Sequence, residues 1–204
     1  RIARCQIGDV EAAVQAARRA FSGQLGEWAR WSARQRSEWL LRFANIIEAH
    51  HEQLAQLECA DTGKPMTQAR GDIGACARYF RFYGGAADKL HGETIPFETD
   101  FAVMTLREPY GVCAQIIPWN YPSQIFGRCV AAALAAGNTV VLKPAEDACL
   151  SVLRLAELAV DHGLPAGALN VVPGLGTEAG VALAAHPNID HLSFTGSPET
   201  GTHV

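Results

Sequence analysis

Residues 111–122 read GVCAQIIPWNYP, and this stretch decides the fold. It opens with a short apolar run and ends at a proline-rich turn, and further short apolar runs follow in the sequence after it. The apolar runs lie at 112–117, 139–142, 169–172 and 191–194. Segments long enough for helices separate them, at 123–136, 150–162 and 177–185. Apolar strands that alternate with helices are typical of parallel sheets buried on both faces. The sequence therefore predicts an α/β fold with a doubly wound parallel sheet, whose ligands bind beyond the carboxyl ends of the strands.

The turn after the first predicted strand holds Asn120 between Pro118 and Pro122. Proline restricts its own backbone and that of the preceding residue, so this turn is stiff. A stiff turn at the end of a strand suits a carboxamide that must point into a crevice. The alternative is an asparagine that only satisfies hydrogen bonds of its own turn, which is common in loops.

The second predicted strand is followed by Lys143-Pro144-Ala145-Glu146. A carboxylate at the end of such a strand suits hydrogen bonds from vicinal ribose hydroxyls, as in dinucleotide-binding folds. The alternative is a solvated lysine beside a glutamate that the dipole of the next helix favours. The spacing alone leaves both interpretations open.

Glycines mark the turns after the third and fourth predicted strands, which read PGLGT at 173–177 and TGSPETG at 195–201. Glycine lets backbone amides approach a phosphate at the start of a helix. Neither turn has the GxGxxG spacing, and no P-loop lysine follows, so each alone is more typical of plain turn chemistry.

The sequence before residue 110 is mainly helical. Apolar residues recur at three- and four-residue steps from Val10 to Phe21 behind Asp9, which suits an N-cap. Ser32 and Gln35 have the spacing of a capping box. They predict one long helix, with an apolar stripe that reaches Leu54 and Leu57 and an end at Gly63. A third helix is predicted from about 66 to 90, although its glycines weaken that prediction.

Between Thr94 and Tyr110 the pattern changes to two β-like runs on either side of Glu98-Thr99-Asp100, which predicts a β-hairpin. In its second arm, 101–106, apolar and polar residues do not alternate regularly, which suits a strand at the edge of a sheet or one that faces a partner. We therefore expect two regions, with helices and the hairpin in 1–110 and the α/β units in 111–204.

Composition excludes several classes of function. The 204 residues carry a formal charge of −4, which argues against a nucleic-acid partner because phosphates require a basic face. No stretch approaches the ~20 consecutive apolar residues that cross a bilayer, and the N-terminal residues read as amphipathic helix rather than as a secretory signal. The six cysteines form no CxxC pair, and the histidines have no metal-ligand spacing. We expect buried thiols in a reducing compartment, the cytoplasm, and no metal.

Four segments together are far more specific than each alone. EPYGVCAQIIPWNYP, GNTVVLKPAED, GLPAGALNVVPGLG and HLSFTGSPETG follow one another in this order. In type and order they resemble signatures of the aldehyde dehydrogenase superfamily, and the resemblance extends over essentially the whole chain. It implies that a nicotinamide dinucleotide binds to the α/β region. In that family a cysteine thiolate attacks the aldehyde, a hydride passes to the nicotinamide, and a glutamate-activated water releases the acid.

The resemblance implies a role for each matching residue. Asn120 would be the catalytic asparagine whose NH2 stabilises the oxyanion, a donor typically worth ~2.7–4 kcal/mol. Tyr121 would face the aldehyde pocket. Lys143 and Glu146 would hold the adenosine ribose, and Gly196 with Ser197 would contact the pyrophosphate. The remaining implied cofactor contacts are Ile116, Ile117, Pro118, Trp119, Gly176, Phe194 and Thr200.

The same resemblance implies NAD as the cofactor. Like charges about 4 Å apart cost ~4 kcal/mol at an effective dielectric of 20, so the Glu146 carboxylate would repel the 2′-phosphate of NADP. Lys143 would soften that repulsion, which leaves NADP possible. The resemblance further implies a small-molecule aldehyde substrate and a homo-oligomer built through the hairpin.

Two departures limit the resemblance. Pro198 follows Ser197 where many relatives have other residues, although proline is tolerated in the first turn of a helix. The family's catalytic cysteine and glutamate would lie beyond Val204, and none of the six cysteines has the nucleophile's context. The chain also begins without Met, so we expect a fragment of a longer enzyme that is inactive alone. The alternative is a non-catalytic module that binds dinucleotide or serves in assembly. An ordinary Rossmann dehydrogenase is disfavoured because GxGxxG is missing.

Overall fold

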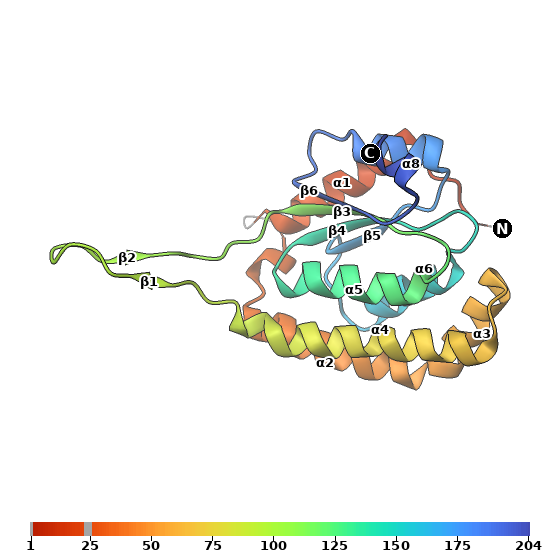
Figure 1. Ribbon diagram of the computed structural model, residues 1–204, viewed down its shortest axis with the longest axis horizontal. Helices are drawn as coiled ribbons and strands as arrows, with labels where there is room; N and C mark the ends of the chain where they lie inside the picture. The colour runs from red at the N-terminus through yellow and green to blue at the C-terminus, as the bar shows by residue number, and fades with distance from the viewer. Residues whose placement is uncertain (1, 23–25) are drawn as a thin grey trace.

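The computed structural model describes residues 2–22 and 26–204, and its central sheet is parallel throughout (Figure 1). The strands are β3 (Val112–Ile116), β4 (Thr139–Lys143), β5 (Leu169–Val171) and β6 (His191–Phe194). They lie in the order β5-β4-β3-β6, each parallel to its neighbours. The chain moves outward from β3 to β5 and then returns to the other side of β3. The doubly wound parallel sheet predicted from the sequence is confirmed, and its topological switch point lies between β3 and β6.

Helices cover both faces of this sheet (Figure 1). On one face α1 (Ile7–Phe21) and α7 (Val181–Ala184) bury Val10, Val14 and Leu183 against Val112 and Val141. On the other face lie α5 (Pro122–Ala135) and α6 (Leu150–Asp161). Strands β3 and β4 are buried along almost their whole length, which explains why they read as continuous apolar runs.

A further helical layer packs on α5 and α6 (Figure 1). It consists of α2 (Ala33–Ala49), α3 (His51–Thr62) and α4 (Met66–Ala86). Helices α4 and α5 pack closely: a Cβ at Gly127 of α5 would lie only 2.9 Å from the Cα of Cys76 of α4, so this contact requires glycine. Gly84 of α4 similarly faces Leu40 of α2. One of the glycines that weaken the helix prediction, Gly84, therefore serves close packing.

The single long helix predicted behind Ser32 is wrong. The capping box of Ser32 and Gln35 is present, and Gly63 ends the segment at a φ of 73°, but His50 leaves helical geometry at φ −102° and ψ 13°. The imidazole Nδ1 of His50 lies 2.9 Å from the carbonyl oxygen of Ile46 and closes α2. After the break, α3 begins at His51, and its residue Glu58 is fully buried whereas the expected Leu57 is only half-buried.

Other boundaries differ by smaller amounts. The first helix starts at Ile7 with Gln6 as N-cap, and Asp9 instead accepts a hydrogen bond from the backbone N–H of Gln6 at 2.8 Å. The helix predicted over 177–185 is a π-helical turn, η3 (Gly176–Gly180), followed by α7. Short 3₁₀ turns, η1 (Trp28–Arg30) and η2 (Ala87–Lys89), and the single-turn α8 (Pro198–Gly201) complete the elements.

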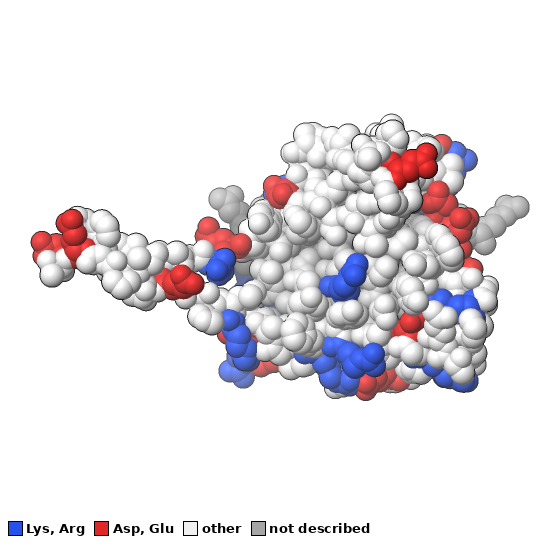
Figure 2. All heavy atoms as spheres, viewed as in Figure 1, with Lys and Arg blue, Asp and Glu red and all other residues white. Residues whose placement is uncertain are grey.

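The predicted hairpin is confirmed and projects away from the body of the molecule (Figure 1). Its strands β1 (Thr94–Ile95) and β2 (Val103–Met104) are antiparallel, with Thr94 opposite Met104. The backbone N–H of Phe101 donates to the carbonyl of Glu98 at 3.1 Å and closes the tip. Acidic side chains gather at that tip in Figure 2.

Candidate functional site

A groove of about 530 Å³ opens at the carboxyl ends of β3, β4 and β6, which is the switch point of the sheet. Every site residue predicted from the sequence except Tyr121 lines it. Three lining residues were not predicted: Ile125 in the first turn of α5, and Ala145 and Thr195, which stand between predicted residues. Their place next to the motifs in the sequence is the signal that would have found them.

Lys143 and Glu146 form an ion pair on the floor of this groove. Lys143 ends β4 and is 2% exposed, and its Nζ donates to Glu146 Oε2 and to the carbonyl of Pro144, both at 3.0 Å. The other carboxylate oxygen, Oε1, accepts a hydrogen bond from the backbone N–H of Gly176 at 3.2 Å. Burial works against ionisation of Glu146, but the hydrogen bonds from Lys143 and from backbone amides outweigh it and hold the pKa of this carboxyl below its usual value.

The turn after β6 forms one rim of the groove. Ser197 is the N-cap of α8, where its Oγ accepts the backbone N–H of Thr200 at 3.2 Å. Pro198 occupies the first turn of α8 and does not prevent it, as expected. A Cβ at Gly196 would lie 2.4 Å from Cζ of Phe194, so only glycine lets the Phe194 ring lie across this turn. Gly196 and Ser197 are nevertheless exposed on this rim.

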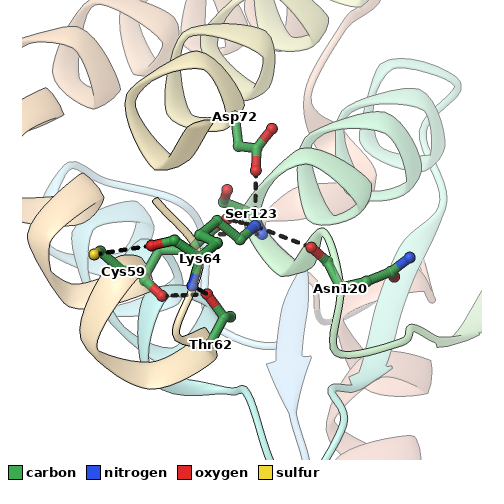
Figure 3. Close-up of polar contacts among 7 residues, drawn as sticks. Cys59, Thr62, Lys64, Asp72, Asn120 and Ser123 are labelled. Atoms are coloured by element: carbon green, nitrogen blue, oxygen red, sulfur yellow. Dashed lines mark hydrogen bonds and ion pairs between the residues drawn. The ribbon is translucent and has the colours of Figure 1, made fainter. Parts of the chain in front are cut away.

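The turn after β3 forms the opposite rim, and Asn120 lies exposed on it between its two prolines. Its backbone carbonyl accepts a hydrogen bond from Lys64 Nζ at 2.9 Å. Figure 3 shows the Asn120 carboxamide directed away from Lys64. The lysine comes from the loop between α3 and α4, a part of the sequence that was not connected with this turn.

Tyr121 is the one predicted site residue that the structure does not bring into the groove. Its half-buried ring packs against the core beneath α5, 5.1 Å from Lys64 Nζ. It therefore lies on the flank of the Asn120 turn that faces the N-terminal helices.

Cys76, Cys113 and Cys149 are buried, whereas Cys5, Cys59 and Cys129 are half-buried, and none of the six lines the groove. Burial first, and the nearby charge of Asp190 second, raise the pKa of Cys113 to about 11. Burial likewise raises the pKa of Cys76, Cys129 and Cys149. Among residues 2–22 and 26–204, no cluster of histidine, cysteine and carboxylate side chains could hold a metal ion. No helix in these ranges combines the length and apolar character needed to span a bilayer.

Comparison with known proteins identifies the family. The model of the aldehyde dehydrogenase family matches residues 1–204. Aldehyde dehydrogenase family 2 member B4 of Arabidopsis thaliana, a mitochondrial protein, is 50% identical over 95% of this chain and 36% of its own length. The NADP/NAD-dependent aldehyde dehydrogenase PuuC of Escherichia coli is 46% identical over 100% of this chain and 41% of its own.

Solved structures agree. An NAD+ complex of an aldehyde dehydrogenase from Bacillus cereus superposes with a TM-score of 0.95 at 45% identity, over 98% of this chain and 40% of that one. This chain belongs to the aldehyde dehydrogenase family. It spans about two fifths of the length of these relatives.

Proposed function

We propose that the protein containing this chain oxidises an aldehyde to the carboxylic acid with NAD, and that the chain supplies the cofactor groove and one oxyanion donor. The observation that carries the proposal is the convergence of Asn120, Lys143, Glu146 and Ser197 on one groove at the switch point of the sheet. The NAD+ complex of the Bacillus cereus neighbour and the coenzyme use stated for PuuC support the choice of a nicotinamide dinucleotide.

The groove fits the adenosine half of that cofactor. Each oxygen of Glu146 already accepts one hydrogen bond, from Lys143 and from Gly176. An ionised carboxylate has about four lone-pair sites, so both oxygens can still accept a ribose hydroxyl. Its charge repels a 2′-phosphate, which favours NAD over NADP. The open turn at Gly196 and Ser197 suits the pyrophosphate.

Asn120 serves the reacting end. When the aldehyde carbonyl is attacked, negative charge develops on its oxygen, and the NH2 of Asn120 donates a hydrogen bond there. The bound nicotinamide supplies the hydride acceptor. The attacking thiolate and the glutamate base come from outside residues 1–204 in this proposal, because none of the six cysteines lines the groove. The chain alone is therefore expected to be inactive.

We also propose a division of labour within the chain. Residues 111–204 bind the dinucleotide, the helices of 1–110 brace that part, and the hairpin at 94–110 joins copies into a homo-oligomer. Exposed apolar side chains on the hairpin support the last point: Ile95, Phe97, Phe101, Met104 and Leu106. The six free thiols favour a reducing compartment such as the cytoplasm.

Coenzyme reduction tests the proposal directly. The protein encoded by the complete reading frame is mixed with NAD and a panel of aliphatic and aromatic aldehydes, and NADH formation and NAD binding are measured by fluorescence. We expect aldehyde-dependent NADH formation. Binding of NAD without reduction by any aldehyde would contradict oxidation and favour a non-catalytic dinucleotide-binding module.

A further inference from the structure

A buried ionic cluster lies behind the Asn120 turn and consists of Glu58 in α3, Lys64 in the loop after α3, and Asp72 on α4. Figure 3 shows Lys64 between Asp72 and the Asn120 turn. The side chain of Glu58 is 0% exposed, and those of Lys64 and Asp72 are each 7% exposed. Lys64 Nζ donates to Glu58 Oε1 at 2.8 Å and to Asp72 Oδ2 at 2.7 Å. These two carboxylates fix the direction of the ammonium group.

The third hydrogen of that ammonium group is aimed at the active-site turn. An ammonium has three donors, and the partner left after the two carboxylates is the backbone carbonyl of Asn120, at 2.9 Å. In the described part of the chain, neither Trp119 nor Asn120 makes a backbone–backbone hydrogen bond. The turn is therefore held by its prolines and by Lys64.

The same cluster fixes the element that follows the turn. Glu58 Oε2 accepts a hydrogen bond from the backbone N–H of Ser123 at 3.2 Å, in the first turn of α5. The ring of Tyr121 lies 5.1 Å from the ammonium of Lys64, within range of a cation–π contact. Contacts from one cluster thus reach Asn120, Tyr121 and Ser123.

Stability is a poor explanation for this cluster. Burying an ion pair costs several kcal/mol per ion in desolvation, and well-packed apolar residues of the same volume are often as stabilising. An apolar side chain at position 64 cannot, however, donate a hydrogen bond to a carbonyl. The feature that requires the charge is the link to Asn120.

We propose that Lys64 is a positioning residue, oriented by Glu58 and Asp72, which holds the Asn120 carbonyl so that its carboxamide points into the groove. This inference rests on the proposed function of Asn120 as oxyanion donor. A donor displaced by about 1 Å costs up to about 100-fold in rate. Lys64 therefore acts on turnover through Asn120 and leaves the dinucleotide contacts of Lys143 and Glu146 unchanged.

A double-mutant cycle in the full-length protein tests the link. Lys64→Met is compared with Asn120→Ala and with the combination of both, and Lys89→Met, at an exposed ion pair of the 3₁₀ turn after α4, is the matched control. We expect Lys64→Met to lower kcat about 10- to 100-fold with the Kd for NAD unchanged. In the Asn120→Ala background it should lower kcat less than about twofold further, because the group that it positions is gone. An equal loss in both backgrounds, or no loss at all, would overturn the proposal.

Hydrogen exchange gives a readout independent of activity. The backbone N–H of Ser123, which donates to Glu58 Oε2, should exchange faster in Lys64→Met than in the unsubstituted protein, while the hairpin at 94–104 exchanges as before. If Lys64→Met does not fold, the same comparison uses Lys64→Met combined with Glu58→Gln and Asp72→Asn, which leaves no unpaired buried charge. Unchanged exchange at Ser123 would overturn the proposal. An unsubstituted protein that oxidises no aldehyde would instead refute the proposed function, and the exchange result would still decide whether Lys64 holds the turn.

Discussion

The ammonium of Lys143 lies 3.0 Å from one carboxylate oxygen of Glu146, and the backbone amide of Gly176 holds the other oxygen at 3.2 Å. The carboxylate that we assign to the ribose is thus fixed by the end of β4 and by the start of η3. Such preorganisation reduces the entropy that a ligand must lose on binding. A substitution of Glu146 is therefore the most direct test of the preference between NAD and NADP.

Glu146→Gln should narrow the preference for NAD over NADP. The substitution keeps the shape of the side chain and removes the charge that repels a 2′-phosphate, so the ratio of kcat/KM for NAD to that for NADP should fall by about tenfold or more. Glu199→Gln, at an exposed carboxylate of α8 outside the groove, is the control. A ratio that stays constant in Glu146→Gln would count against the ribose assignment.

The ion pair with Lys143 should also appear in the pH dependence of stability. The pKa of Glu146 is lowered in the folded protein, so its contribution is present above the unfolded value of about 4.3 and is lost as the pH falls through the folded pKa. The difference in free energy of unfolding between the unsubstituted protein and Glu146→Gln should shrink in acid. Urea unfolding well above and well below about pH 4.3 measures it. A stability difference that grows in acid would contradict a lowered pKa of Glu146 in the folded protein.

Asn120→Ala should reduce kcat about 100- to 1000-fold, which is the usual loss of one oxyanion donor. Because the carboxamide acts only in the transition state, the Kd for NAD should change little. Steady-state kinetics with a substrate whose acylation limits the rate, together with NAD titration, measure both. Asn188→Ala, at an exposed asparagine outside the groove, controls for loss of an amide. An unchanged rate in Asn120→Ala would remove the residue from the mechanism.

The buried thiols should resist alkylation. With a pKa of about 11, Cys113 has on the order of a thousandth of its sulfur as thiolate near pH 8, and Cys76 is fully buried with its pKa raised further. Iodoacetamide followed by peptide mass mapping should leave both unmodified in the native protein and modify both in guanidinium. If either thiol is modified as fully in the native protein as in guanidinium, that thiol is accessible to solvent.

The hairpin should be needed for assembly. Phe101 and Leu106 are exposed on an arm that projects from the body, and a surface of this kind is typical of an interface (Figure 1). Replacing both with Ser should lower the mass measured by light scattering at micromolar protein, with unfolding temperature little changed. Phe82→Ser removes an equally exposed aromatic side chain on α4 and serves as the control. A mass that falls only in the control would place the interface elsewhere.

The sequence predicts the parallel sheet and the turns that line the groove far better than the buried ionic cluster behind the Asn120 turn. Strands β3 and β4 are buried on both faces, so their apolar runs and following turns are visible in a linear sequence. Lys64 and Asp72 carry no such mark, because buried charges among helical residues have no periodic signature. Glu58 lies on the buried face of α3 with Leu54, at a position where an apolar residue would be expected. The Lys64–Asn120 link joins residues 56 positions apart, and no local pattern encodes a contact of that kind.

The near-contact of Gly127 with Cys76 has a consequence beyond packing. Asp72, which binds Lys64, lies on α4, and α5 begins two residues after Asn120. The separation of these two helices therefore sets the distance between Lys64 and the Asn120 turn. The methyl group of an alanine at position 127 would therefore push α4 and α5 apart. The carboxamide of Asn120 can thus be put out of alignment from deep in the interior, by a change at a residue that does not line the groove.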